Sequence, residues 1–166
     1  MVNETDPFCY GAHVFANGIR QHYLRYGGAD AGPPLVIVPG ITSPAATWGF
    51  VGKRFGRCFD TYVVDVRGRG LSSSGPELDY SLDSYARDIA AFAKALGLQP
   101  YFLVGHSMGA RIAIRAARAM LCRAGFVVAS DQSGDGSKAS ARPRMGGWRT
   151  LLSHSVCRLE RAAPAA

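Results

Sequence analysis

The sequence predicts an α/β fold, in which helices cover both faces of a mostly parallel sheet that follows an N-terminal antiparallel hairpin. Two observations predict it. Short apolar runs recur along the chain, and segments with apolar residues at three- and four-residue spacing lie between them. Such runs are typical of strands buried on both faces of a parallel sheet, and their alternation with helices is typical of layered α/β proteins. The 166 residues are enough for one domain with a core.

The expected strands begin with the hairpin. Residues His13–Ala16 and Ile19–Tyr26 flank Asn17-Gly18, a pair that readily takes the positive φ angles of a tight turn. Apolar runs then predict four strands of the parallel sheet. These runs are Leu35–Val38, Thr61–Val66, Tyr101–Val104 and Gly125–Ala129.

Two helices are expected between these strands. The first covers Ser81–Leu96, with Ser81 or Asp79 as its N-terminal cap and Gly97 after its end. Its inward face is predicted by the spacing of Leu82, Tyr85, Ile89, Phe92 and Leu96. The second helix runs from Ser107 to about Met120 and packs Ile112, Ala113, Ala116 and Ala117 inward.

The pattern of strands and helices stops near Gln132, and the charge changes there as well. Residues 1–110 contain nine Lys+Arg and nine Asp+Glu, whereas residues 111–166 contain ten and three, so the whole net charge of +7 lies in the last third. We therefore expect the N-terminal part of an α/β domain over 1–131 and a basic, poorly ordered tail over 132–166. A basic end on a neutral body does not indicate a nucleic-acid surface, and we expect no nucleic-acid partner.

Cysteine spacing and hydropathy bear on the compartment. The four cysteines are widely spaced without a Cys-x-x-Cys pair, which is typical of reduced thiols and argues against a zinc site. The N-terminus carries no signal-peptide pattern, and no apolar run approaches a membrane span. We expect a cytoplasmic protein with no membrane partner, no metal and no cofactor. The sequence does not indicate an oligomeric state.

Gly105-His106-Ser107-Met108-Gly109 carries the chemistry that the sequence predicts. A Gly-x-Ser-x-Gly segment after a buried strand and before a helix is the pattern of a nucleophile elbow. The serine occupies a strained turn that projects its hydroxyl above the sheet, and the small flanking residues let strand and helix approach. Ser107 is therefore the expected nucleophile, and the packing of His106 is expected to support it.

An oxyanion hole requires backbone N–H groups that point at the developing negative charge. The residue after the nucleophile, Met108, is expected to supply one, and Ile41, in the loop after Leu35–Val38, the other.

Asp65-Val66-Arg67-Gly68-Arg69-Gly70-Leu71-Ser72 has the form Asp-x-Arg-Gly-x-Gly-x-Ser. Together with the elbow, it makes the sequence resemble the α/β-hydrolase superfamily, which implies the α/β-hydrolase fold, here without the lid and the C-terminal strands. In that superfamily the motif is structural, and Asp65 and Arg67 are expected to tie loops together.

Within the superfamily the sequence is similar to the N-formylmaleamate deformylases, which act in aerobic nicotinate breakdown and split a formyl amide into formate and maleamate. The similarity covers roughly residues 10–120. It rests on Ala16–Arg25, on Pro39–Pro44 with Trp48–Val51, on Asp65–Gly75 and on Leu103–Arg111. It implies a small-molecule amide or ester substrate, with Thr42, Ser43 and Arg111 as candidate binding residues.

A catalytic triad needs an acid and then a histidine after the serine. The acid is expected at Asp131, after the strand Gly125–Ala129, with Asp135 as the weaker candidate. His154 is the histidine that follows, 47 positions beyond Ser107, in a basic segment with no predicted strand before it. His154 is either the base or a surface histidine. The alternative function is therefore a catalytically inactive fragment, truncated or frame-shifted after about residue 131.

Overall fold

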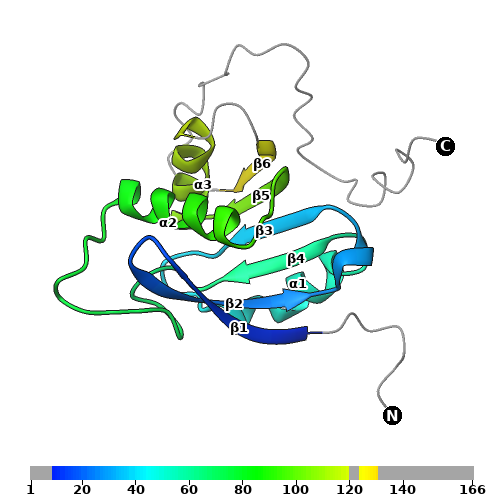
Figure 1. Cartoon of the computed structure of the whole chain (residues 1–166), viewed down its shortest axis with the longest axis horizontal. Helices are drawn as coiled ribbons and strands as arrows, with labels where there is room; N and C mark the ends of the chain where they lie inside the picture. Colours follow the sequence, from blue (N-terminus) through cyan, green and yellow to red (C-terminus); the bar gives the residue numbers. More distant parts are fainter. Residues whose placement is uncertain (1–8, 120–123, 131–166) are drawn as a thin grey trace. The chain divides into compact units, whose positions relative to one another are not determined.

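The computed structural model describes residues 9–119 and 124–130. Within these ranges the chain forms one mixed sheet with helices packed on it (Figure 1). The predicted tail over 132–166 lies outside the described residues.

The sheet has six strands in the order β1-β2-β4-β3-β5-β6. The hairpin strands β1 and β2 are antiparallel, and β2 also pairs antiparallel with β4; β4, β3, β5 and β6 are parallel to one another. The strands are β1 (Cys9–Ala16), β2 (Ile19–Tyr26), β3 (Pro34–Val38), β4 (Asp60–Val64), β5 (Tyr101–His106) and β6 (Ala124–Ser130). All six strands therefore confirm the sequence prediction, with bounds shifted by a few residues.

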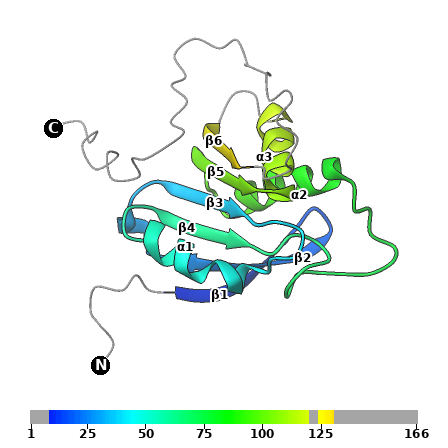
Figure 2. The same ribbon diagram turned by 180° about the vertical axis from the view of Figure 1, so that it is seen from behind.

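Three α-helices pack on the sheet. Two of them, α2 (Leu82–Ala95) and α3 (Met108–Ala119), lie side by side on one face, and α1 (Gly49–Phe55) lies on the other (Figures 1 and 2). Two short 3₁₀ helices, η1 (Ala29–Ala31) and η2 (Ala45–Trp48), lie in loops. The helices α2 and α3 and the two-sided covering were predicted, but α1 was not. No helix in the described ranges has the length and apolar character that crossing a membrane requires.

Alternation along the buried strands separates two hydrophobic cores. In β3, Val36 and Val38 face the core under α2 and α3, whereas Leu35 and Ile37 face the core under α1. Since the side chains of a strand alternate between faces, a wholly apolar run is what a sheet covered on both sides requires.

The turn of the hairpin and the start of α2 follow the predicted local chemistry. Asn17 and Gly18 have φ angles of +50° and +75°, as a tight two-residue turn requires. Ser81 caps α2, since its hydroxyl accepts a hydrogen bond of 3.2 Å from the N–H of Ser84. A hydrogen bond from the Ser84 side chain, followed in importance by those from Ser81, lowers the pKa of Asp79 to about 2.

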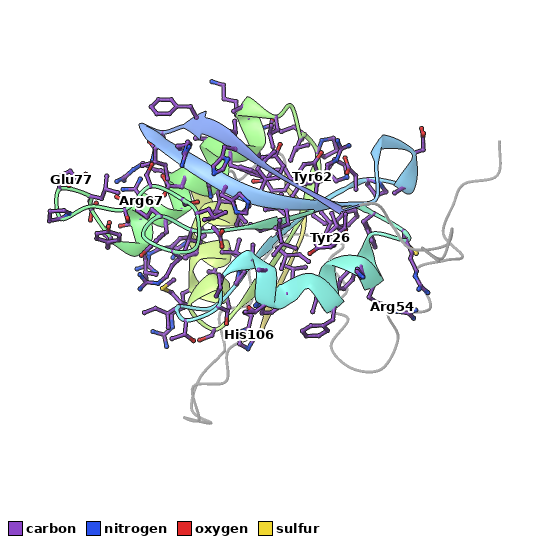
Figure 3. The ribbon with its side chains drawn as sticks, turned by 90° about the horizontal axis from the view of Figure 1, so that it is seen from below. Tyr26, Arg54, Tyr62, Arg67, Glu77 and His106 are labelled. Atoms are coloured by element: carbon purple, nitrogen blue, oxygen red, sulfur yellow. The ribbon has the colours of Figure 1, made fainter. Side chains whose placement is uncertain are left out.

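Helix α1 depends on close contact with one aromatic ring. A Cβ atom at Gly52 would lie 2.3 Å from the Tyr26 ring, and one at Gly56 would lie 2.8 Å from the Tyr26 Cβ (Figure 3). Glycine at both positions lets the helix lie directly on β2.

Candidate active site

Ser107 lies at the junction of β5 and α3, the position that the sequence predicts for a nucleophile. It has a φ of +53°, a backbone conformation that residues other than glycine rarely adopt. The carbonyl of Ser107 accepts hydrogen bonds from Ala110 (3.0 Å) and Arg111 (3.4 Å), so α3 begins immediately after the strained residue. The strained strand–turn–helix geometry of a nucleophile elbow is therefore present.

Two glycines make this turn sterically possible. A Cβ atom at Gly105 would lie 2.3 Å from the Gly109 carbonyl oxygen, and one at Gly109 would lie 2.0 Å from the Val38 carbonyl oxygen. These contacts bring β5, α3 and the end of β3 together around Ser107. No larger residue fits at either position without backbone movement.

His106 packs under the turn. Its ring lies 5.3 Å from the ring of Trp48, measured between centroids, and Figure 3 labels its position. Its Nδ1 atom is buried and makes no hydrogen bond to any described residue. The packing role expected for His106 matches this aromatic contact.

The loop after β3 forms a tight turn beside Ser107. A Cβ atom at Gly40 would lie 3.4 Å from the Cβ of Ser107, so the turn and the serine are neighbours. The Gly40 carbonyl accepts a hydrogen bond of 3.2 Å from the N–H of Ser43. Because a trans peptide is planar, this bond directs the N–H of Ile41 to the opposite side of the turn. The orientation of the predicted oxyanion donor is thus fixed by the turn itself.

The second N–H predicted for the oxyanion hole belongs to Met108. Met108 is the first residue of α3. The first N–H groups of a helix have no partner within the helix, and the helix dipole favours negative charge there. Both features suit the binding of an oxyanion.

Asp65 connects three segments around this loop. One carboxylate oxygen accepts the N–H of Ala45 at 2.6 Å, and the other lies 2.7 Å from His22 Nδ1 and 3.1 Å from the N–H of Leu71. Gly70, with a φ of +53°, approaches this carboxylate so closely that a Cβ atom would overlap it. Asp65 therefore holds the loop after β3 to the loop after β4.

Arg67 connects the loop after β4 to helix α2. Its guanidinium donates two hydrogen bonds of 2.6 Å to the carboxylate of Asp88 and one of 2.9 Å to the carbonyl of Asp79. Both members of this pair are buried. The hydrogen bond to Asp88 is the main cause of the raised pKa of Arg67. The predicted loop-tying roles of Asp65 and Arg67 agree with these contacts.

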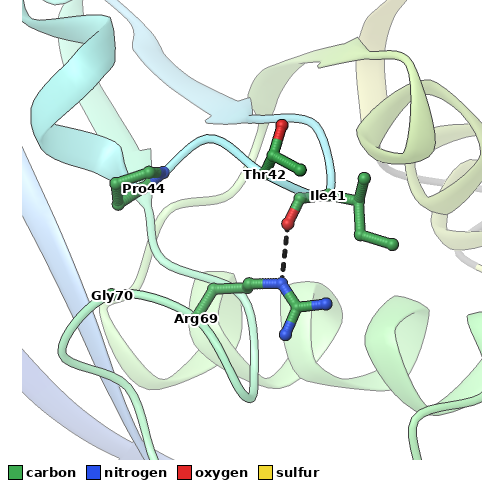
Figure 4. Close-up of a pocket in the computed structure, with 5 residues that line it drawn as sticks. All are labelled: Ile41, Thr42, Pro44, Arg69 and Gly70. Carbon is green, nitrogen blue, oxygen red and sulfur yellow. Dashed lines mark hydrogen bonds between the residues drawn. The ribbon is translucent and has the colours of Figure 1, made fainter.

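A pocket of about 550 Å³ lies against the loop after β3, and Figure 4 shows its lining. It is lined by Ile41, Thr42, Pro44, Arg69 and Gly70. Arg69 donates from Nε to the Ile41 carbonyl at 2.6 Å and from Nη1 to the Gly68 carbonyl at 2.8 Å. The bond from Nε orients the peptide unit of Ile41 and Thr42, next to the expected oxyanion donor.

The predicted site residues fall into two groups. The structure brings Ser107, Met108 and the turn at Ile41–Ser43 to one edge of the sheet. Asp131 and His154 lie outside the described residues, as does the weaker candidate acid Asp135. Of the candidate binding residues, Thr42 lines the pocket and Ser43 closes the turn. Arg111 is an exposed residue of α3 that does not line the pocket.

Arg69 is the pocket residue that sequence reasoning missed. It stands at a variable position of the Asp-x-Arg-Gly-x-Gly-x-Ser pattern, so the motif assigns it no role. The signal available was its place between two glycines, Gly68 and Gly70.

Within the described ranges, His, Cys, Asp and Glu side chains form no cluster that could hold a metal ion. The functional groups brought together at this edge of the sheet are a hydroxyl, backbone amides and one guanidinium. These groups suit attack on a carbonyl and stabilisation of the resulting anion.

Comparison with known proteins agrees with this geometry. A family described as "Alpha/beta hydrolase family" matches residues 35–165. An N-formylmaleamate deformylase of Pseudomonas putida is 71% identical over 110 residues, which make up 66% of this chain and 40% of the relative. A 2-(acetamidomethylene)succinate hydrolase of Mesorhizobium japonicum is 41% identical over 87 residues, or 52% of this chain and 31% of the relative.

A solved structure gives the same result. The N-formylmaleamic acid deformylase of Pseudomonas putida S16 has a TM-score of 0.65 and 52% identity, covering 72% of this chain and 46% of that one. The chain therefore spans less than half the length of each of these relatives.

Proposed function

Because the chain belongs to the α/β-hydrolase family, we propose that it cleaves the amide bond of a small N-acyl compound with Ser107 as nucleophile. The observation that carries the proposal is the strained Ser107, with its φ of +53°, beside the turn at Gly40–Ser43. The 71% identity to a deformylase supports N-formylmaleamate as the substrate, with maleamate and formate as products.

The first step forms a bond between Ser107 Oγ and the formyl carbon. The hydroxyl proton passes to a histidine, and the carbonyl oxygen becomes an oxyanion. The amide N–H groups of Ile41 and Met108 then donate to this oxyanion. Since the turn and the helix start fix both amides before the substrate arrives, they stabilise the charge without reorganising.

The second step breaks the C–N bond. The histidine returns its proton to the leaving nitrogen, maleamate departs, and the formyl group remains on Ser107 as an ester. Water then attacks this ester with the same histidine as base, which releases formate and restores the serine. These steps use side chains, backbone amides and water.

The acid and the base belong to the part of the chain outside the described residues. We assign the acid to Asp131, since it follows β6 and the order serine, acid, histidine places it after Ser107. His154 is the histidine of this chain that follows Asp131, so it is the residue to test as base. We propose the cytoplasm as the compartment, because four widely spaced cysteines are typical of reduced thiols.

The test is formate release from N-formylmaleamate by the purified chain, assayed beside Ser107→Ala and His154→Gln. We expect release by the unmodified chain and a loss on the order of 10⁴-fold or more in Ser107→Ala. An equal loss in His154→Gln identifies the base. Assay of 2-(acetamidomethylene)succinate in parallel shows which acyl group the site prefers.

The opposite outcome is equally informative. If soluble, folded protein releases no more formate than Ser107→Ala does, the chain lacks a working base, and the alternative of an inactive fragment replaces the proposal.

A further inference from the structure

Arg69 places a cation in the pocket beside the predicted oxyanion donor. Its Nε donates to the Ile41 carbonyl at 2.6 Å and its Nη1 to the Gly68 carbonyl at 2.8 Å. Ile41, Thr42, Pro44 and Gly70 complete the lining (Figure 4). The guanidinium is therefore held by two backbone carbonyls at the wall of the pocket.

These two bonds leave part of the guanidinium available to a ligand. Nη2 and one hydrogen of Nη1 remain as donors. Neither Nη2 nor the remaining Nη1 hydrogen is used by a described residue, and Arg69 forms no ion pair with a carboxylate in the described ranges. By contrast, the buried Arg67, two residues earlier, is paired with Asp88. A fixed guanidinium with free donors in a partly apolar pocket is suited to bind a carboxylate through two hydrogen bonds.

We propose that Arg69 is a specificity-determining residue that binds a carboxylate of the substrate and, through the Ile41 carbonyl, positions the loop that supplies an oxyanion donor. The inference rests on the proposed function and names its substrate class as N-acyl compounds that carry a carboxylate. The substrates after which two relatives are named, N-formylmaleamate and 2-(acetamidomethylene)succinate, each carry a carboxylate and an acylated nitrogen.

The contact to Ile41 couples the two roles. The carbonyl of Ile41 accepts from Arg69 Nε, and the carbonyl of Gly40 accepts from the N–H of Ser43, so both peptide units of the turn are held. A carboxylate bound at Nη2 and at the remaining hydrogen of Nη1 leaves the bonds to the Ile41 and Gly68 carbonyls in place. The charged end of the substrate is thus held next to a turn that already presents the oxyanion donor.

The test measures binding by titration calorimetry, independently of turnover. The probes are maleamate, which carries a carboxylate, and its diamide, in which an amide replaces that carboxylate. Arg69→Gln is compared with Arg115→Gln, which removes an exposed arginine paired with Asp83 and so makes the same change in charge and side chain. We expect maleamate to bind Arg69→Gln at least about tenfold more weakly than the unmodified chain, because a charged hydrogen bond is lost. Binding of the diamide and binding by Arg115→Gln are expected to change less than twofold.

Three results overturn the inference: no binding of maleamate by the unmodified chain, equal binding by Arg69→Gln, or equal weakening of maleamate and the diamide. The last of these assigns Arg69 to the loop alone. A second measurement does not depend on how the variant folds: in the unmodified chain, the NMR signal of the Arg69 Nε–H group shifts with maleamate and not with the diamide. A missing shift contradicts the inference, whereas missing formate release with intact maleamate binding contradicts the proposed reaction alone.

Discussion

At the residue scale, the geometry of the elbow depends on the two glycines that flank Ser107, because neither position has room for a side chain. Gly105 faces the Gly109 carbonyl, and Gly109 faces the Val38 carbonyl, at distances that leave no room for a methyl group. The neighbours are backbone atoms, which cannot rotate away as a flexible side chain does. Both glycines are therefore steric requirements of the junction between strand and helix, and their presence in the sequence predicts the close approach.

We expect Gly109→Ala to destabilise the protein by about 3 kcal/mol or more, because its Cβ atom would lie 2.0 Å from the Val38 carbonyl oxygen. The matched control is Gly28→Ala, where a Cβ atom meets nothing within 4 Å and φ is −163°. The midpoint of urea unfolding measures both. A midpoint for Gly109→Ala equal to that of Gly28→Ala would show that β3 and α3 do not approach as closely as described.

Residue-scale prediction worked where the chemistry is local and failed where it is not. Ser107 and its glycines lie in one five-residue segment, so the motif was sufficient to find them. Arg69 and Ile41 are 28 positions apart. Their contact arises only when the loops after β3 and β4 meet at the same edge of the sheet, and no local pattern encodes that meeting.

At the scale of elements, the loop after β4 acts as a clamp. Through Asp65 it holds the turn after β3, and through Arg67 it holds helix α2. Asn17 in the hairpin turn also donates to Asp88, at 2.7 Å. Asp88 therefore connects the loop after β4 and α2 to the hairpin turn, where Asn17 lies 71 positions away in sequence.

Asp88→Asn tests this clamp. Removing one member of a buried pair leaves Arg67 buried without its counter-charge, so we expect a loss of about 3–5 kcal/mol in the free energy of unfolding. Asp83→Asn is the matched control, since Asp83 lies on the same helix and pairs with Arg115 at the surface. Its expected cost is below about 1 kcal/mol. Similar losses for the two variants in urea unfolding would contradict the clamp.

Helix α1 shows why one element escaped prediction. Its seven residues, GFVGKRF, include two glycines and are too few to display a helical period. The helix forms because Gly52 and the following Gly56 receive the ring and backbone of Tyr26 from β2. Its stability comes from tertiary contact, whereas α2, with fourteen residues and a Ser81 cap, was visible in the sequence alone.

At the scale of the whole molecule, one sheet carries two cores, one under α2 and α3 and the other under α1. The four parallel strands and the two-sided covering followed from apolar runs, because a run with no polar alternation must be buried on both faces. The two hairpin strands followed from the Asn17-Gly18 turn between them. The residues predicted as acid and base, Asp131 and His154, come after β6, where the periodic pattern of the sequence ends. The prediction of Asp131 rested on its place after a predicted strand and on the order serine, acid, histidine, whereas that of His154 rested on the order alone.

If the two faces of the sheet unfold together, a substitution that destabilises one core must also shift the unfolding transition of the other. Phe92 of α2 is fully buried in the core under α2 and α3. Its ring centroid lies 5.2 Å from that of Tyr23 and 6.2 Å from that of Tyr62. Trp48 packs against the other core, the one under α1. In a Trp148→Phe background it is the sole tryptophan, so its fluorescence reports on that core.

We expect Phe92→Ala to lose about 3–5 kcal/mol, through lost burial and the cavity left behind. Because the strands between the cores are shared, the urea transitions followed by Trp48 fluorescence and by far-ultraviolet circular dichroism should shift together. Phe50→Ala, at a position that is 77% exposed, is the control and should shift neither by more than about 0.5 kcal/mol. A Trp48 transition that stays in place while the dichroism moves would mean that the two faces unfold separately.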